Sequence, residues 1–298
     1  MYFQDLIETL FDKDTCDYLA RKHIGGTSGE KGNTYENFFA VYQLAKLAGE
    51  GIGGSSNIAI ASQIQAFVDD LIIAMNDVSL FRHYQLKNSP SVAWGKGLRS
   101  IADDFEKQYQ LNRAVSKTSE LNLVVSDSDL QNRLAASLPP AISPYSQVGY
   151  FPYDSNLLKV IAQKPSFRKA LEDLSAFNNP ESDKVECVAM VLLGAWISSG
   201  KSGNLIEILQ KAQQCQPSYI RSLSGVEAEL DAEVIKIMDE IPDFTYILSK
   251  GFLHWEFQGG LDKGTLRYSC ETEEFQRFQE LIRQNSPTSF EAIEGFLL

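Results

Sequence analysis

Two pairs of polar residues have the chemical types that a metal-assisted attack on a phosphate needs. Asp69 and Asp70 head one apolar run, and Gln85 and Lys87 stand about fifteen positions further along, at the end of another. Mg²⁺ prefers oxygen ligands such as those of carboxylates and amides. A bound metal polarises a phosphate and lowers the pKa of a water molecule. A lysine beside it orients that water and stabilises the charge of the transition state.

Two neighbouring antiparallel strands would bring these pairs together. The apolar runs at 68–74 and 80–87 are short enough, and rich enough in β-formers, to predict strands. Side chains alternate along a strand, so Gln85 and Lys87 point to the same face. Because lysine is almost never fully buried without a partner, we expect it to meet the acids that head the neighbouring strand.

The rest of the chain up to residue 138 predicts the elements around those strands. A glycine-rich stretch at 25–32 predicts a loop, and the apolar spacing after it predicts a helix that carries Glu36. The resulting order of helix, strand, acid-headed strand, strand, helix and strand predicts an α/β fold. The further predicted elements are a strand at 58–61, a helix at 97–113, a strand at 121–125 and a helix at 127–138 capped by its first aspartate.

This ordered set resembles the PD-(D/E)xK nuclease superfamily, in the variant that has glutamine two residues before the lysine, Gln85-Leu86-Lys87. The glycine-rich stretch that leads into residues 35–40 is similar to the opening of the double-stranded DNA endonuclease effectors of bacterial anti-phage systems. Those nucleases are attached to cyclic-oligonucleotide signalling and to Lamassu-type defence. The resemblance extends over residues 25–138 and implies a restriction-endonuclease-like core.

The resemblance also implies a role for each matching residue. Asp70, the Gln85 carbonyl oxygen or adjacent backbone, and Glu36 would bind Mg²⁺ (or Mn²⁺), and Lys87 would hold the attacking water. Asp70 is preferred because the aspartate of the superfamily runs straight into three apolar residues, and Asp69 is the reserve choice. Glutamine in place of a carboxylate removes one negative charge, so we expect weaker metal binding unless Glu36 compensates.

Other polar residues near these strands have a functional and a structural interpretation. Lys96, Arg99 and Lys107 lie on the helix predicted after the third strand and are candidates for contact with the DNA backbone. A solvated helix face is the alternative. His83, on the same strand face as Gln85, would either touch a substrate phosphate or be a packed, hydrogen-bonded neighbour.

Four prolines between residues 139 and 152 mark the predicted domain boundary. Apolar stripes such as 188–195 in the C-terminal half favour a partner-binding or oligomerisation module, and the alternative is that they fill the core of their own domain. The predicted domains are an N-terminal helical segment at 1–24, a nuclease domain at 25–150, and a mainly helical domain at 151–298 with one β-hairpin at 252–257 and 265–270.

The charge distribution limits what the chain can bind. The sequence has 27 basic and 39 acidic residues and a formal net charge of −12, which argues against nucleic-acid binding over the whole chain. Residues 21–150 are net neutral, with twelve charges of each sign, so any contact with a polyanion falls there. Four scattered cysteines make neither a disulfide framework nor a zinc site, and the apolar runs are too short for a membrane span. We expect a cytoplasmic protein with no membrane partner.

These observations together predict a Mg²⁺-dependent endonuclease that hydrolyses double-stranded DNA as the effector of a bacterial anti-phage defence complex. The expected partners are double-stranded DNA and an ATPase or other defence-system subunit, a second copy of the chain, or both. The alternative is a non-catalytic scaffold subunit built on a decayed nuclease fold. The net negative charge and the lack of a strongly basic stripe are compatible with that alternative.

Overall fold

The computed structural model describes residues 4–11, 13–26, 30–51, 57–214, 219–224 and 229–297. The chain forms two compact units, and each has its own β-sheet, so the predicted α/β class is confirmed. The first unit comprises Met1–Leu44, Ser55–Arg168 and Leu193–Ile208, and the second comprises Ala45–Gly54, Lys169–Leu192 and Leu209–Leu298.

Three helices open the chain: α1 (Gln4–Leu10), α2 (Lys13–Gly26) and α3 (Glu30–Gly51). The glycine-rich stretch at 25–32 is therefore less of a loop than predicted, because α2 continues through Gly26 and α3 starts at Glu30. Residues 27–29 lie outside the described residues. Helix propensity is a weak preference that packing overrides, and the first unit buries Leu19 of α2 and Tyr35 of α3 almost completely.

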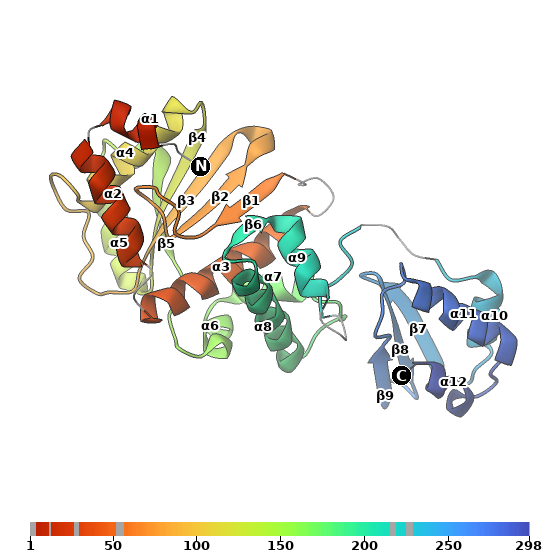
Figure 1. The fold of residues 1–298 in the computed structure, drawn as a ribbon. Coiled ribbons are helices and arrows are strands. Elements are labelled where there is room, and N and C mark those ends of the chain that lie inside the picture. The colour runs from red at the N-terminus through yellow and green to blue at the C-terminus, as the bar shows by residue number, and fades with distance from the viewer. Residues whose placement is uncertain are drawn as a thin grey trace. The chain divides into compact units, whose positions relative to one another are not determined.

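A six-stranded mixed sheet forms the centre of the first unit, in the order β5-β4-β3-β2-β1-β6 (Figure 1). Strands β1, β2 and β3 form the predicted antiparallel meander. Strands β4 and β5 lie parallel to β3, and β6 pairs antiparallel with β1. Helix α4 (Ile101–Ala114) connects β3 to β4, and α5 (Ser128–Ala136) connects β4 to β5. The strands are β1 (Ile58–Ala61), β2 (Leu71–Met75), β3 (Leu80–Lys87), β4 (Thr118–Val125), β5 (Ser146–Tyr150) and β6 (Ser202–Asn204).

Helices cover both faces of this sheet, and adjacent residues of β3 identify which helix covers which face. The ring of Tyr84 lies 5.1 Å from that of Phe39 on α3. His83, the preceding residue, points to the opposite face, where its Nε2 atom lies 3.5 Å from the side-chain nitrogen of Gln108 on α4. Helix α3 and the crossover helix α4 therefore enclose β3 between them.

The proline-rich segment contains a strand where the sequence predicts a domain boundary. After the 3-10 turn η2 (Ser143–Tyr145), β5 adds to the sheet beside β4. Phe151 follows it and is fully buried, with its ring 5.9 Å from that of Tyr35 and its carbonyl oxygen accepting the Tyr35 hydroxyl at 2.8 Å. The first compact unit consequently runs past residue 150 and recruits β6 from much later in the chain.

The second sheet contains three strands in the order β7-β8-β9, where the sequence predicts a single hairpin (Figure 1). Strand β8 (Phe252–Phe257) matches the prediction, β7 (Phe244–Ser249) was missed, and β9 (Asp262–Thr265) begins earlier than the predicted strand at 265–270. Within β9, a Cβ atom at Gly264 would lie 2.6 Å from the Trp255 ring. Only glycine lets the indole approach the strand so closely.

The remaining helices are α6 (Leu157–Gln163), α7 (Pro165–Leu174), α8 (Ser182–Ser198), α9 (Leu205–Gln213), α10 (Ala232–Asp239), α11 (Glu273–Asn285) and α12 (Phe290–Leu297), and one 3-10 turn, η1 (Asn76–Val78), lies between β2 and β3. Within the stripe at 188–195, Val188 and Leu192 are completely buried. These two side chains are therefore covered by the protein's own residues. Over the residues with a described structure, no helix is long and apolar enough to cross a membrane.

Candidate functional site

Asp70 and Gln85 meet at one end of the six-stranded sheet, as the sequence predicts. The antiparallel register pairs Leu71 of β2 with Tyr84 of β3, and one step further Asp70 lies opposite Gln85. The Gln85 side-chain amide donates a hydrogen bond to Asp70 Oδ2. The backbone N–H of Leu86 donates to the same oxygen at 2.6 Å. Both side chains are more than nine-tenths buried, so the contact is held rigidly.

Glu36 reaches the same end of the sheet from α3. Its Oε2 atom accepts a hydrogen bond from the Gln63 side chain at 2.8 Å. Burial and, after it, the negative charge of Asp70 raise the pKa of Glu36 to about 7, against the opposing effects of the Gln63 hydrogen bond and the Lys201 charge. Glu36 is therefore close to half-protonated at neutral pH, and a nearby cation would favour its charged form.

The turn after β1 connects these residues. Ser62 Oγ donates a hydrogen bond to the backbone oxygen of Asp70 at 2.8 Å. The backbone N–H of Gln63 donates to the backbone oxygen of Asp69, also at 2.8 Å. Gln63 has a φ of 55°, a left-handed conformation that is uncommon for a residue with a side chain. Such backbone conformations persist where the surrounding structure enforces them, and here the result is the contact with Glu36.

Lys87 is half-buried at the last position of β3, on the same strand face as Gln85. Among the residues that the structure describes, its ammonium group has no hydrogen-bond or ion-pair partner. The sequence predicts that Lys87 contacts an acid of the neighbouring strand. In the structure, the side chain of Gln85 makes that contact with Asp70. Lys87 thus lies at the strand end two residues after Gln85, and none of the described residues forms an ion pair with it.

The reserve residue Asp69 and the neighbouring His83 differ in what they contact. Asp69 is 5% exposed, and its charge contributes to the raised pKa values of Glu36 and of Tyr18 on α2. His83 is completely buried, with Nδ1 2.8 Å from the backbone oxygen of Val68, and burial lowers its pKa to about 4. His83 is thus a neutral, packed neighbour, as the structural interpretation expects.

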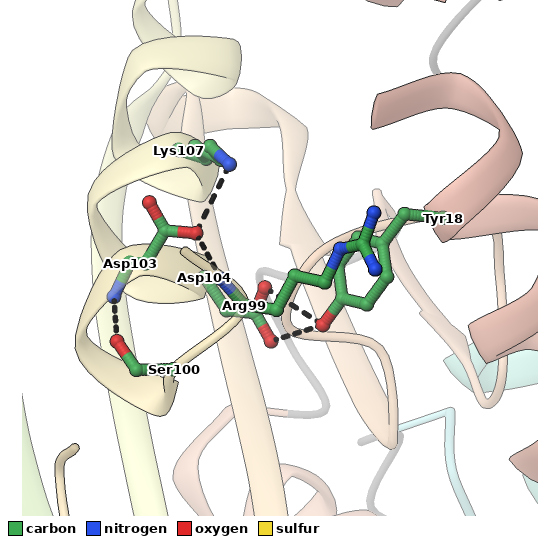
Figure 2. A network of polar contacts seen from close by, with 6 residues as sticks. All are labelled: Tyr18, Arg99, Ser100, Asp103, Asp104 and Lys107. Carbon is green, nitrogen blue, oxygen red and sulfur yellow. Dashed lines mark hydrogen bonds and ion pairs between the residues drawn. The ribbon is translucent and has the colours of Figure 1, made fainter. Parts of the chain in front are cut away.

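Lys107 is already paired within the protein. Its ammonium group lies 3.0 Å from Asp103 Oδ2 on the preceding turn of α4, and the two side chains are 16% and 19% exposed (Figure 2). The same carboxylate accepts the backbone N–H of Arg99 at 2.7 Å. Because Asp103 neutralises its charge, Lys107 is a weaker candidate for a DNA-backbone contact than its sequence position implies.

Arg99 and Lys96 lie before α4, although the sequence places both on the helix. The Arg99 guanidinium group lies over the ring of Tyr18 at 5.2 Å, and the Tyr18 hydroxyl donates to the carboxylate of Asp104 at 3.1 Å (Figure 2). This network ties α2 to α4. Of the three predicted DNA contacts, Lys96 is exposed and takes no part in the network.

The donor set at the sheet end fits a hard cation such as Mg²⁺ in chemical type. Both hydrogen bonds to the Asp70 side chain end on Oδ2, so Oδ1 is the oxygen that could face a metal. Over the described part of the chain, no group of three or more His, Cys, Asp or Glu residues could hold a metal ion. Such a site would therefore have at most two carboxylate ligands, such as Asp70 and Glu36, and the other ligands would be amide or backbone oxygens and water.

The sequence does not identify two residues of this arrangement, Gln63 and Lys201. Gln63 lies in a segment with no motif, and only the fold brings it to Glu36. Lys201 lies in a Gly-Lys-Ser-Gly turn more than a hundred residues after Lys87, and β6 carries it to the same sheet end. The glycines at 200 and 203 signal a turn there, but no local pattern indicates where that turn lies in the fold.

No family model matches the chain, and the chain has no significant match among curated proteins or solved structures.

Proposed function

We propose that this protein is a metal-dependent endonuclease that hydrolyses phosphodiester bonds of double-stranded DNA. The observation that carries the proposal is the convergence of Asp70, Gln85 and Lys87 at adjoining strand ends, with Glu36 beside them. The order α3-β1-β2-β3-α4-β4, with an antiparallel meander followed by a parallel crossover, is the order expected of a restriction-endonuclease-like core. The proposal rests on this geometry together with the resemblance of the Gln-x-Lys motif.

Each residue has a defined task in this mechanism. Asp70, Glu36 and the Gln85 carbonyl oxygen or adjacent backbone would hold Mg²⁺ or Mn²⁺. A metal held there would polarise the phosphate and lower the pKa of a water molecule. Gln85 holds Asp70 Oδ2 and so orients the carboxylate, and Lys87 positions the attacking water and stabilises the added negative charge. Water adds to phosphorus and loses a proton, the bond to one sugar oxygen breaks, and that oxygen takes up a proton, so the products are a terminal phosphate and a sugar hydroxyl group.

We further propose that the nuclease acts as an effector in a bacterial anti-phage complex, with an ATPase or other defence-system subunit, or a second copy of the chain, as its partner. The support for this step is the resemblance of the segment around residues 25–40 to such effectors. The acidic C-terminal half, with 14 basic and 22 acidic residues over 151–298, favours a protein over DNA as its partner.

Plasmid cleavage with matched variants tests the proposal. The purified chain is incubated with supercoiled plasmid in Mg²⁺, in Mn²⁺ and in EDTA. Asp70→Asn and Lys87→Met are compared with Asp129→Asn and Lys159→Met, which change exposed residues of the same unit. We expect cleavage only with metal, a loss of about 10²-fold or more in the two site variants, and the parental rate in the two controls. Metal-independent cleavage, or site variants as active as the parent, would refute it.

One observation favours the scaffold alternative. Asp70 Oδ2 already accepts two hydrogen bonds, from Gln85 and from the backbone of Leu86, so the site is stable without a cation. A decayed nuclease would keep this contact as a structural element. It would bind no Mn²⁺ by calorimetry and would leave plasmid intact under every metal condition, alone or with its partner.

A further inference from the structure

A second lysine, Lys201, lies at the same sheet end as the candidate site. It immediately precedes β6, and β6 pairs with β1 so that Ser202 lies opposite Ala61. The backbone oxygen of Lys201 accepts the N–H of Ser62 at 3.0 Å, and Ser62 Oγ donates to the backbone oxygen of Asp70 at 2.8 Å. Two successive hydrogen bonds therefore connect the backbone of Lys201 to that of Asp70.

The Lys201 side chain is directed toward the helix that carries Glu36. Its ammonium group donates to Asn33 Oδ1, on α3 one turn before Glu36. An ammonium group has three N–H donors, and among the described residues Asn33 supplies the hydrogen-bond acceptor for one of them. The charge of Lys201 opposes the rise in the pKa of Glu36, yet no ion pair within 4.0 Å joins the two described side chains. The lysine and the carboxyl group thus share one electrostatic environment without direct contact.

The backbone at Lys201 has a conformation that few residues other than glycine adopt. Its φ is 57°, and its N–H donates to the Trp196 oxygen at 3.1 Å. Gly200, the preceding residue, has a φ of 65°. A second glycine would adopt this conformation without steric cost, whereas a lysine incurs one. A strained residue whose side chain is held beside a candidate active site indicates a task for that side chain.

We propose that Lys201 is a catalytic residue that binds a non-bridging oxygen of the phosphodiester group, an inference that rests on the proposed nuclease function. Asp70, Glu36 and the neighbouring Asp69 supply three negative charges, and a divalent metal with Lys87 would supply three positive ones. Lys201 turns this balance into a surplus of one positive charge. That surplus matches a phosphodiester anion whose negative charge increases as water adds, and glutamine at position 85 adds no carboxylate to cancel it.

Steady-state kinetics on a short DNA duplex in Mg²⁺ measure the contribution of Lys201. We compare Lys201→Met and Lys201→Arg with Lys159→Met, which changes an exposed lysine of the same unit. We expect Lys201→Met to lower kcat/KM roughly 10²-fold, mostly through kcat, because the contact strengthens in the transition state. Lys201→Arg should recover most of the rate, and Lys159→Met should leave it unchanged.

Binding of the same duplex in Ca²⁺, at increasing salt, gives a second readout that needs no turnover. A lost phosphate contact lowers the slope of log affinity against log salt by about 0.9. We expect this change for Lys201→Met and not for Lys159→Met. If Lys201→Met does not fold, as judged by circular dichroism, Lys201→Asn removes the same charge with a residue that tolerates the left-handed backbone.

The outcomes separate this inference from the proposed function. A parent that cleaves, together with a Lys201→Met variant that has the parental rate and the parental salt slope, would overturn the role of Lys201 and leave the nuclease proposal intact. A parent that binds DNA without cleaving it, with a reduced slope in the variant, would overturn the nuclease proposal and retain the phosphate contact. A parent that neither binds nor cleaves would overturn both.

Discussion

Replacing Glu36 by glutamine is expected to stabilise the protein at high pH while it abolishes cleavage. Burial is the largest cause that raises the pKa of Glu36, and the charge of Asp70 is the next, whereas the Gln63 hydrogen bond and the Lys201 charge lower it. The result is a pKa of about 7 in place of the ordinary 4.5. Glutamine has nearly the same shape, and its carbonyl oxygen can still accept the hydrogen bond from the Gln63 amide.

The sign of the effect follows from the two pKa values. A carboxyl group with a raised pKa in the folded state loses its proton more easily in the unfolded chain, so the free energy of unfolding falls as pH rises above about 4.5. The loss is complete above the folded pKa of about 7. A shift from 4.5 to about 7 corresponds to about 3 kcal/mol. Solvent screening at this half-buried position reduces the effect to roughly 1–3 kcal/mol.

Urea unfolding at pH values from 5 to 8 measures this effect in the parent, in Glu36→Gln and in Glu106→Gln, which changes an exposed glutamate of α4. We expect the parent and Glu36→Gln to be equally stable near pH 5 and to diverge by roughly 1–3 kcal/mol at pH 8. Added Mg²⁺ should restore stability to the parent alone, because a cation favours the charged form of Glu36. A stability difference that is the same at every pH would refute the reasoning.

Three further perturbations test other parts of the structure. Lys87→Ala is expected to slow plasmid cleavage about 10²-fold or more. Its melting temperature should stay close to that of the parent, because the Lys87 ammonium group has no described partner. An unchanged cleavage rate would contradict the proposed role of Lys87. Lys96→Met should reduce the salt dependence of duplex binding, measured by anisotropy titration. Lys107→Met should leave the affinity for DNA unchanged and lower the free energy of unfolding by roughly 1 kcal/mol, measured by thermal melting, because it breaks the ion pair with Asp103. An equal loss of DNA affinity in both variants would contradict the view that Lys96, and not Lys107, contacts DNA. A chain that ends at residue 150 should not fold, because it lacks Phe151 and β6, and a cooperative melt by circular dichroism would prove this wrong.

The local pattern of the sequence predicts the central elements of the first unit well. Strand β3 runs over the predicted residues 80–87, β1 over 58–61, and α5 begins after the predicted aspartate, Asp127, whose carboxylate accepts the Leu130 N–H at 2.6 Å. Apolar periodicity and helix capping act over a few residues, so they can be recognised without the fold. The sequence also predicted that Asp70 and Gln85 lie at the same sheet end, because two adjoining antiparallel strands bring their polar ends together, although it assigned the contact with the acid to Lys87 and not to Gln85.

The tertiary structure alone determined which distant segments complete the sheet and the site. Strands β5 and β6 are short, contain glycine and lack strong alternation, so their existence depends on pairing with β4 and β1. Gln63 and Lys201 have no motif, and both side chains reach the site from left-handed turns. Pairing between strands far apart in sequence is decided by the burial of a shared core, which one strand's own residues do not encode. The placement of Asp70 and Gln85 at adjoining strand ends could thus be predicted from the sequence, and the groups that surround them depend on the fold.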